Sequence, residues 1–263
     1  MDLGLKDKVA LVTASTKGLG KATAASLAFE GANVVINGRH KQNIHDAVAE
    51  IKSKSGRTPL AVQGDLTQAE DIDRLFDEVT RHYGTVHILV SNAGGPPAGA
   101  FDDFNDEQWL KAVDLSLMSA VRLIRRAAPI MQKQKWGRIV NISSVTVKQP
   151  AENLLLSNSI RAAVIGLVKT ISRDLSRDNV LINSVAPYYV GTKRIDYLME
   201  ETAAKKRITK EEALKKIVKE IPMGRLGTPE EFGEFVTFLC SEKNSYVTGA
   251  TIPFDGGAYR GIM

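Results

Sequence analysis

The chain has 263 residues, of which 43% are hydrophobic and 25% charged, which is enough apolar material for a large buried core. Its 35 Lys and Arg residues against 30 Asp and Glu give a formal charge of +5, without the basic arm or aromatic-basic interleaving of nucleic-acid binders. Cys240 is the single cysteine, so no internal disulfide forms, and no segment is long and apolar enough to span a membrane. No repeat or linker divides the sequence, so we expect one domain, residues 1–263, in the cytoplasm.

A short apolar strand beginning at Val9 leads into a glycine turn, A-S-T-K-G-L-G at 14–20, and then into a helix of small residues. Gly18 and Gly20 permit a tight turn and close backbone approach. The helix that starts there points free N–H groups and its positive dipole end at an anion. This order predicts a site for a dinucleotide pyrophosphate, although the glycines alone also fit an ordinary strand-turn-helix.

Further apolar strands recur along the chain, rich in β-branched residues rather than alternating: 33–36, 60–63, 86–90, 138–142, 180–185 and 251–254. Such strands are buried on both faces, as in a parallel sheet, and helical patterns separate them here. The sequence therefore predicts an α/β fold, a doubly wound parallel sheet flanked by helices.

The helices between these strands show apolar residues at i, i+3, i+4 and i+7. Ile72 to Val79 has this spacing after a capping box at Thr67 and Glu70, and Thr228-Pro229 predicts another helix start. Two further helices are expected around Trp109 to Leu117 and over 162–175.

One segment, Thr192 to Pro222, is helical, polar and long, with a capping box at Thr209 and Glu212. It fits a solvated helix pair with ion pairs from Glu211 to Lys215 and from Glu212 to Lys216. Because it follows the carboxyl end of a strand, where open α/β sheets bind ligands, it is also predicted to be a lid over a substrate.

Several local motifs occur in order: T-A-S-T-K-G-L-G at 13–20, G-D-L at 64–66, N-A-G-G at 92–95, N-I-S-S at 141–144, N-S-V-A-P at 183–187, G-R-L-G-T-P-E-E at 224–231 and T-G-A-T-I-P-F-D-G-G at 248–257. Together they resemble the short-chain dehydrogenase/reductase family, in particular its 3-oxoacyl carrier-protein reductases, over nearly the whole chain. The resemblance implies a Rossmann fold with a seven-stranded parallel sheet, a bound nicotinamide dinucleotide, and a homotetramer or dimer. No metal site is predicted.

The family's catalytic group is an asparagine, a serine, and a tyrosine and lysine within Tyr-x-x-x-Lys. The resemblance places Ser144 on the serine, Ser157 on the tyrosine, Arg161 on the lysine and Ser116 on the asparagine. An aliphatic alcohol is too weak an acid to replace a phenol as general base, but Ser157 and Ser144 can donate hydrogen bonds to a carbonyl oxygen.

Ser157 and Arg161 are four residues apart, so they share a helix face, and Arg161 can occupy the place of the lysine beside the nicotinamide ribose. The alternative for this pair is a helix cap and a surface arginine. Tyr188 replaces the glycine that usually follows the proline of N-S-V-A-P. Its phenol is expected either to donate to the substrate or to pack beside the cofactor.

The dinucleotide is expected to be NADP(H) rather than NAD(H). Gly38 and Arg39 stand where family NAD enzymes carry an acid, and Lys17 adds a second cation for a 2′-phosphate. The expected cofactor-binding residues are those of the turn, the adenine and ribose loops, the nicotinamide loop and the helix: Thr13, Ser15, Thr16, Lys17, Gly18, Leu19, Gly20, Arg39, Asp65, Leu66, Asn92, Ala93, Gly94, Arg161, Pro187, Val190 and Thr192.

Three functions remain open on the sequence alone. The first is an NADP(H)-dependent oxidoreductase that acts on a small-molecule carbonyl or alcohol, such as an oxoacyl thioester, a sugar or a sugar acid. The second, suggested by the missing tyrosine, is a nucleotide-binding sensor or assembly protein without turnover. The third is dehydration or epimerisation on the same scaffold. Ser144 and the nicotinamide loop favour the first, because a pure binder needs neither.

Overall fold

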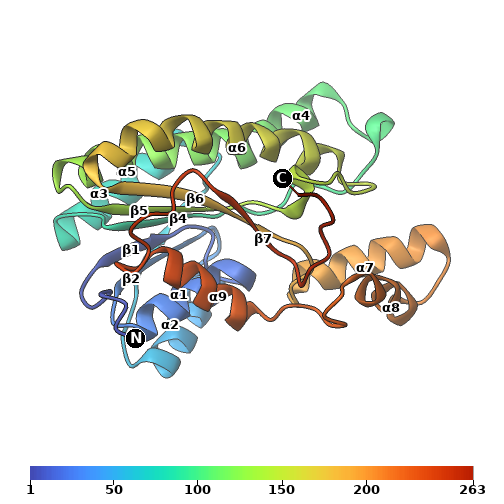
Figure 1. Ribbon diagram of the computed structural model, residues 1–263, viewed down its shortest axis with the longest axis horizontal. Helices are drawn as coiled ribbons and strands as arrows, with labels where there is room; N and C mark the ends of the chain where they lie inside the picture. The colour runs from blue at the N-terminus through green and yellow to red at the C-terminus, as the bar shows by residue number, and fades with distance from the viewer. Residues whose placement is uncertain (263) are drawn as a thin grey trace.

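Seven parallel strands form the centre of the computed structural model, in which residues 1–262 are described (Figure 1). Their spatial order is β3-β2-β1-β4-β5-β6-β7, and every neighbouring pair is parallel. The strands are β1 (Val9–Val12), β2 (Asn33–Gly38), β3 (Leu60–Gln63), β4 (Ile88–Ser91), β5 (Gly137–Ile142), β6 (Val180–Pro187) and β7 (Thr251–Phe254). The predicted doubly wound sheet is confirmed.

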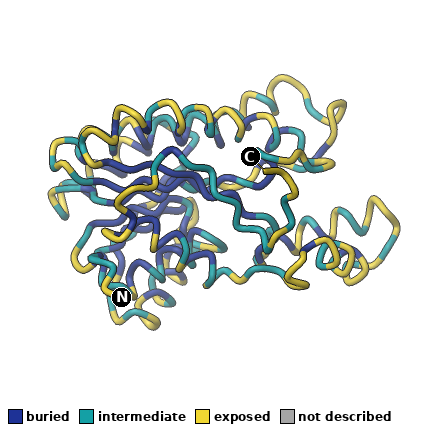
Figure 2. Tube along the Cα trace, viewed as in Figure 1, coloured by how far each residue is buried: buried dark blue, intermediate teal, exposed yellow. Residues whose placement is uncertain are grey.

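Helices cover both faces of this sheet. One face carries α1 (Gly18–Phe29), α2 (Lys41–Ser55) and α9 (Pro229–Leu239), and the other carries α3 (Ala69–Tyr83), α5 (Ser119–Lys133) and α6 (Leu155–Leu175) (Figure 1). Every residue of β1, β4, β5 and β6 is buried, as Figure 2 shows for the sheet. These strands read as continuous apolar runs because both of their faces are covered.

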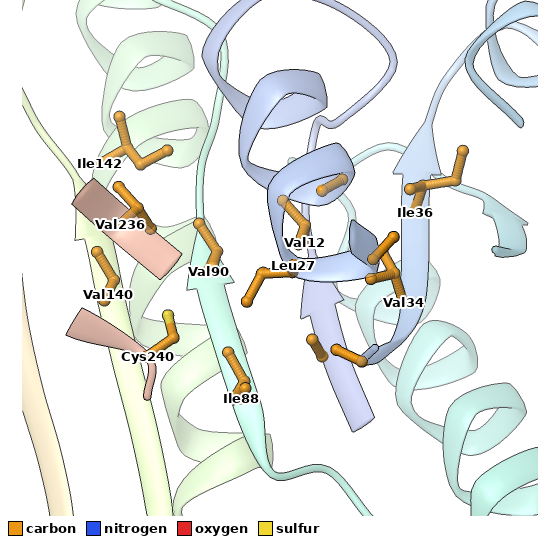
Figure 3. Packing of buried hydrophobic residues seen from close by; sticks show 14 of the residues in the cluster. Val12, Leu27, Val34, Ile36, Ile88, Val90, Val140, Ile142, Val236 and Cys240 are labelled. Carbon is orange, nitrogen blue, oxygen red and sulfur yellow. The ribbon is translucent and has the colours of Figure 1, made fainter. Parts of the chain in front are cut away.

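The core beneath α1 and α9 is made of closely packed aliphatic side chains. Leu27 of α1 lies among Val12, Val90 and Ile36 of three strands, with Cys240 at the end of α9 (Figure 3). Cys240 is fully buried, and burial raises the pKa of its thiol. The interpretation of this cysteine as a buried thiol in an apolar helical run is therefore confirmed.

The order of the strands reverses between β1 and β4. The chain moves outward from β1 to β3 and returns to pair β4 with the other side of β1. The loops after these two strands therefore diverge in opposite directions, which opens a crevice at their carboxyl ends. Thr13 and Asn92 follow β1 and β4 at this point.

The expected capping box at Thr67 and Glu70 is wrong. Helix α3 begins at Ala69, and its N-cap, Gln68, makes no side-chain cap. Both the backbone N–H and the hydroxyl of Thr67 donate to Asp65, at 3.0 and 2.9 Å. The carboxylate two residues earlier forms a local turn that competes with the helix cap.

The boxes at Thr209–Glu212 and Thr228–Glu231 both form, the second with Pro229 in the first helical turn. They start α8 (Lys210–Glu220) and α9. None of the helices within residues 1–262 combines the length and apolarity needed to cross a membrane.

Helix α8 and its neighbour α7 (Lys193–Lys206) project beyond the carboxyl end of the sheet (Figure 1). The pair has a small core of its own, in which Ile195, Met199 and Ala213 are buried. Because these side chains pack against one another rather than against the sheet, α7 and α8 form a unit with its own core, which also contacts the main body through Lys205 and Asn153.

The predicted ion pairs of this segment are wrong. Neither Glu211–Lys215 nor Glu212–Lys216 forms within the described residues; the Glu212 carboxylate accepts the backbone N–H of Thr209 instead. Lys210 of α8 joins the two helices of this segment, because its ammonium lies 2.9 Å from Asp196 and 3.1 Å from Glu200 of α7. The ion pairs of this segment form between two helices. The spacing of charged residues within one helix does not predict such pairs.

Candidate functional site

The turn between β1 and α1 has the backbone conformation that a phosphate cradle needs. Ala14 and Gly18 have φ of 45° and 54°, in the left-handed region. A Cβ on Gly20 would lie 2.6 Å from the Asn92 side chain and 2.7 Å from the Ala14 carbonyl. The N-cap of α1, Lys17, provides no side-chain cap, so the first N–H groups of this helix stay free for an anion.

Asn92 joins this turn to the end of β4. Its backbone N–H and C=O bond the Thr13 hydroxyl at 2.9 and 2.7 Å, and its amide donates to the carbonyls of Thr13 and Ala14. The hydroxyl of Ser15 bonds the Val12 carbonyl and accepts the backbone N–H of Asn37. Hydrogen bonds from the ends of β1, β2 and β4 therefore hold the shape of the turn.

The end of β2 has little room beside the turn. A Cβ at Gly38 would lie 2.5 Å from the Thr16 methyl group, so any larger residue would have to displace the Thr16 side chain. Arg39 follows, exposed, with its guanidinium 3.8 Å from the Asp65 carboxylate. Leu66 beside it is buried. Arg39 is therefore in reach of the crevice and is already paired with an acid.

The nicotinamide loop expected at 187–192 lies across the crevice from this turn. The Thr192 side chain is 3.7 Å from the Cβ position of Gly18. Val190 is buried and pairs with Gly227 of the segment before α9. At Gly94, on the β4 side, a Cβ would meet nothing within 4 Å, so the backbone there is open.

A cluster of hydroxyl groups lies where β5 ends and α6 begins. The Ser144 hydroxyl accepts the backbone N–H of Thr146 at 3.3 Å, and the Thr146 hydroxyl lies 3.5 Å from that of Ser157. Thr146 and Ser157 are both buried. The structure thus brings Ser144 and Ser157 to one place through Thr146, a residue that the sequence analysis did not single out.

Arg161 lies one turn beyond Ser157 on α6. Its guanidinium donates to the Ile142 carbonyl at 3.1 Å, and it lines the same small cavity as Ser91 and Ala93 at the end of β4. Burial first, and then the charge of Arg194, lower the pKa of Arg161 to about 10. It is still charged at neutral pH and is in a position to meet a ligand of the crevice.

Ser116 lies in a π-helical segment, Asp114–Met118, between α4 (Asp106–Val113) and α5. It lines the cavity beside Arg161, which has a volume of about 10 Å³. The hydroxyls of Ser116 and Ser143 have no hydrogen-bond partner within residues 1–262, although both are buried. Single-turn π-helices occur frequently at functional sites, and this one places Ser116 in the wall of the same cavity as Arg161.

Tyr188 lies at the lid side of the site. Its hydroxyl donates to the Glu220 carboxylate of α8 at 3.2 Å, and its ring packs edge-on against Tyr189. Burial and the Glu220 charge raise the pKa of the Tyr188 phenol. The phenol is therefore a weaker acid than usual, and its role in binding a substrate stays a prediction.

Three residues in contact with this site escaped the sequence analysis: Ser143, Thr146 and Arg194. Ser143 and Thr146 flank Ser144 in S-S-V-T, where short side chains at the carboxyl end of a strand were the available signal. Arg194 stands two residues after Thr192 and reaches the Pro96 carbonyl at 3.0 Å. In the sequence Arg194 is one of several charged residues of the segment 192–222, and only the folded chain shows that it reaches the loop after β4.

The arrangement fits a nicotinamide dinucleotide. The left-handed Gly18, the uncapped start of α1 and the open backbone at Gly94 are the features that close approach of a phosphate and a ring requires. The fold and this crevice together define a Rossmann-type α/β protein.

Comparison with known proteins gives the family. A family profile described as "Enoyl-(Acyl carrier protein) reductase" matches residues 13–259. The 3-oxoacyl-[acyl-carrier-protein] reductase FabG of Aquifex aeolicus is 35% identical over 259 residues, covering 98% of this chain and 100% of that protein. The chain belongs to the short-chain dehydrogenase/reductase family.

Two NADPH-associated proteins are also similar. The NADPH-dependent reductase BacG of Bacillus subtilis is 30% identical over 98% of this chain and 100% of its own length. The crystal structure of L-sorbose reductase from Gluconobacter frateurii, complexed with NADPH and L-sorbose, superposes with a TM-score of 0.94 at 31% identity, covering 100% of both chains.

Proposed function

We propose that this protein is an NADP(H)-dependent reductase or dehydrogenase that interconverts a carbonyl compound and its alcohol. The observation that carries the proposal is the hydroxyl cluster of Ser144, Thr146 and Ser157 beside Arg161, at the carboxyl ends of β4 and β5. A nicotinamide bound in the crevice supplies or accepts the hydride. The two electrons and the carbon-bound hydrogen of the alcohol come from it, and the hydroxyl proton comes from water.

The polar side chains act on the carbonyl oxygen. Ser144 and Ser157 donate hydrogen bonds to it as negative charge develops, a preorganised arrangement worth roughly 3 kcal/mol for each well-placed donor. Ser157 is not the general base, because its hydroxyl stays protonated at neutral pH. Arg161 holds the nicotinamide ribose and stabilises developing charge, and the free hydroxyl of Ser116 lies beside it.

The preference for NADP(H) rests on Arg39, Lys17 and Gly38. A guanidinium binds a phosphate through two parallel hydrogen bonds, and Gly38 carries no acid that would repel one. Arg39 is 3.8 Å from Asp65, so a 2′-phosphate takes the place of that weak contact. The NADPH bound to the similar L-sorbose reductase supports this preference.

The segment 192–222 acts as the substrate lid in this proposal. Arg194 contacts the loop after β4, and Lys205 of α7 lies 3.4 Å from Asn153 in the loop before α6. Both contacts draw α7 over the hydroxyl cluster.

The assembly of the chain as a homotetramer or dimer in the cytoplasm stays a prediction, and sedimentation analysis checks the number of subunits.

The experiment is a panel of aldehydes, ketones, sugars and oxoacyl thioesters, with oxidation of NADPH and of NADH followed by absorbance. We expect turnover with NADPH, and a lower dissociation constant for NADPH than for NADH. Ser157→Ala should lower kcat by about two orders of magnitude, the loss typical of one removed oxyanion donor, with the dissociation constant of NADPH unchanged.

Ser159→Ala is the matched control, because Ser159 is exposed on the same helix, and its kcat should stay at the wild-type value. Tight NADPH binding without oxidation across the whole panel would contradict the enzyme proposal and favour a nucleotide sensor. Equal kcat in Ser157→Ala and wild type would remove Ser157 from the site.

A further inference from the structure

Two arginines face the crevice without an acidic partner. Arg161 donates to the carbonyl of Ile142, and Arg194 donates to the carbonyl of Pro96. Neither forms an ion pair with an Asp or Glu of residues 1–262. Because a guanidinium has five N–H donors, most of the donors of both side chains are unused by the protein.

Other buried or bridging arginines of this chain are used differently. Arg138 bonds three backbone carbonyls and lies over the ring of Trp136. Arg126 bonds both Asp73 and Asp77. Arg161 and Arg194 have fewer partners: each donates to one backbone carbonyl, and Arg194 also lies over the ring of Tyr197, 5.3 Å from its centroid. Neither has the several bonds of Arg138 or the two carboxylates of Arg126.

The two guanidiniums lie against the same loop after β4: Arg161 lines the cavity beside Ala93, and Arg194 lies beside Gly95. Arg194 begins α7 but reaches back to the loop after β4, where its guanidinium is 3.1 Å from the Cβ position of Gly95. Its charge contributes to the lowered pKa of Arg161, and burial lowers the pKa of Arg194 as well. Two partly buried positive charges without a counterion are unfavourable, and an anion bound beside them relieves both the repulsion and the loss of hydration.

We propose that the substrate is an oxo acid whose carboxylate is bound by Arg194, with its carbonyl oxygen at Ser157. The inference rests on the proposed function and names its substrate class. A carboxylate fits the fork of a guanidinium through two parallel hydrogen bonds, and the product is the corresponding hydroxy acid. The positive charge of Arg161 adds to the attraction from the other side of the crevice.

The alternative anion is a phosphate of the cofactor. In the proposed arrangement, the free N–H groups of α1, Lys17 and Arg39 already serve the cofactor phosphates. Arg194 bonds to Pro96, beyond Gly94 and toward Arg161. Substrate carboxylate and cofactor phosphate give different results when substrate charge and cofactor affinity are measured separately.

The test compares acetoacetate with methyl acetoacetate and levulinate with methyl levulinate, which differ in charge but keep the same carbonyl. NADPH oxidation gives kcat and KM for wild type, Arg194→Gln and Arg194→Lys. We expect KM of the acids to rise about ten- to a hundredfold in Arg194→Gln, as for a lost charge-assisted hydrogen bond, and KM of the esters to change by less than about threefold. Arg194→Lys should lie between the two, because it keeps the charge and loses the fork.

Lys216→Gln is the matched control, since it removes one charge from an exposed lid position that forms no ion pair within the described residues. It should leave the KM of the acids unchanged. Equal losses for acid and ester in Arg194→Gln would show that Arg194 only holds the lid, and a raised dissociation constant for NADPH would assign it to a cofactor phosphate. Either result overturns the inference.

Binding measurements separate this inference from the proposed function. Quenching of NADPH fluorescence by acetoacetate or levulinate gives their dissociation constants even if no turnover occurs. An Arg194-dependent dissociation constant without turnover supports the carboxylate site and contradicts the reductase. Turnover of the esters with kcat/KM equal to that of the acids supports the reductase and overturns the carboxylate site.

Discussion

Arg161 is the residue of the proposed site whose charge can be followed by titration. Its pKa is lowered to about 10, first by burial and then by Arg194, whereas the phenol of Tyr188 has a raised pKa and stays protonated. The serine hydroxyls do not titrate in water. The pH dependence of the reaction should therefore reflect the protonation state of the Arg161 guanidinium.

We expect kcat/KM with a neutral carbonyl substrate to be flat from about pH 6.5 to 9 and to fall as the pH rises through the lowered pKa of Arg161. The charged form is the protonated one, so activity is present below this pKa and lost above it. Arg161→Lys should move the fall to lower pH, because lysine has the lower ordinary pKa and the same burial lowers it further. A fall between about pH 7 and 8 in the wild type would assign the reaction to another acid.

Single residues differ in how far the sequence predicts their surroundings. The shared face of Ser157 and Arg161 follows from helical spacing, and the closeness of Gly18 and Gly20 to a phosphate follows from their order after a strand. Thr146 and Arg194 could not be found in this way. Their positions depend on the path of a 3₁₀ turn and on a contact between segments 98 residues apart.

At the scale of elements, the strands and most helices are predictable because burial on both faces leaves a continuous apolar run in the sequence. The failures occur where two groups compete for one side chain. Asp65 takes the Thr67 hydroxyl that is expected to cap α3, and the backbone N–H of Thr209 takes the Glu212 carboxylate that is expected to pair with Lys216. Such competition depends on the relative free energies of local turns and helix contacts, which spacing does not encode.

The lid segment has a packing core separate from that of the sheet, so it should unfold separately. Met199 is only 1% exposed and packs with Ile195 and Ala213. We expect Met199→Ala to destabilise α7 and α8 by about 2–5 kcal/mol, the usual range for this change. Hydrogen exchange of their amides should accelerate and substrate KM should rise.

Met131→Ala provides the comparison, since Met131 is equally buried but belongs to the core between the sheet and α5. It should lower the midpoint of unfolding of the whole domain, while Met199→Ala should leave that midpoint within error of wild type. A lowered midpoint in Met199→Ala would mean that lid and sheet unfold together.

At the scale of the whole molecule, a large hydrophobic core lies on each face of the sheet, and the core beneath α1 and α9 contains the thiol of Cys240. The thiol is fully buried at the end of α9, and its raised pKa leaves almost no thiolate at neutral pH. Its reactivity therefore depends on opening of this core.

Labelling of Cys240 with a thiol reagent should be slow in the native protein and should accelerate with denaturant in parallel with the loss of α-helix, because both require opening of the core. NADPH should slow it further, since a ligand that binds only the folded chain lowers the unfolded fraction. Rapid labelling in buffer alone would contradict the burial of this residue.

The bonds between Thr13 and Asn92 join positions 79 residues apart, yet they fix the loop nearest the start of the chain. During synthesis, residues 13–20 leave the ribosome long before their partner does. The nascent strand-turn-helix unit of β1 and α1 therefore lacks the Thr13–Asn92 hydrogen bonds that shape its phosphate-binding turn. These bonds can form only after β4 has emerged and paired with β1. The chain should therefore bind a nucleotide only late in its synthesis. A nascent chain arrested before Asn92 should not bind to an immobilised nucleotide that retains the full-length protein.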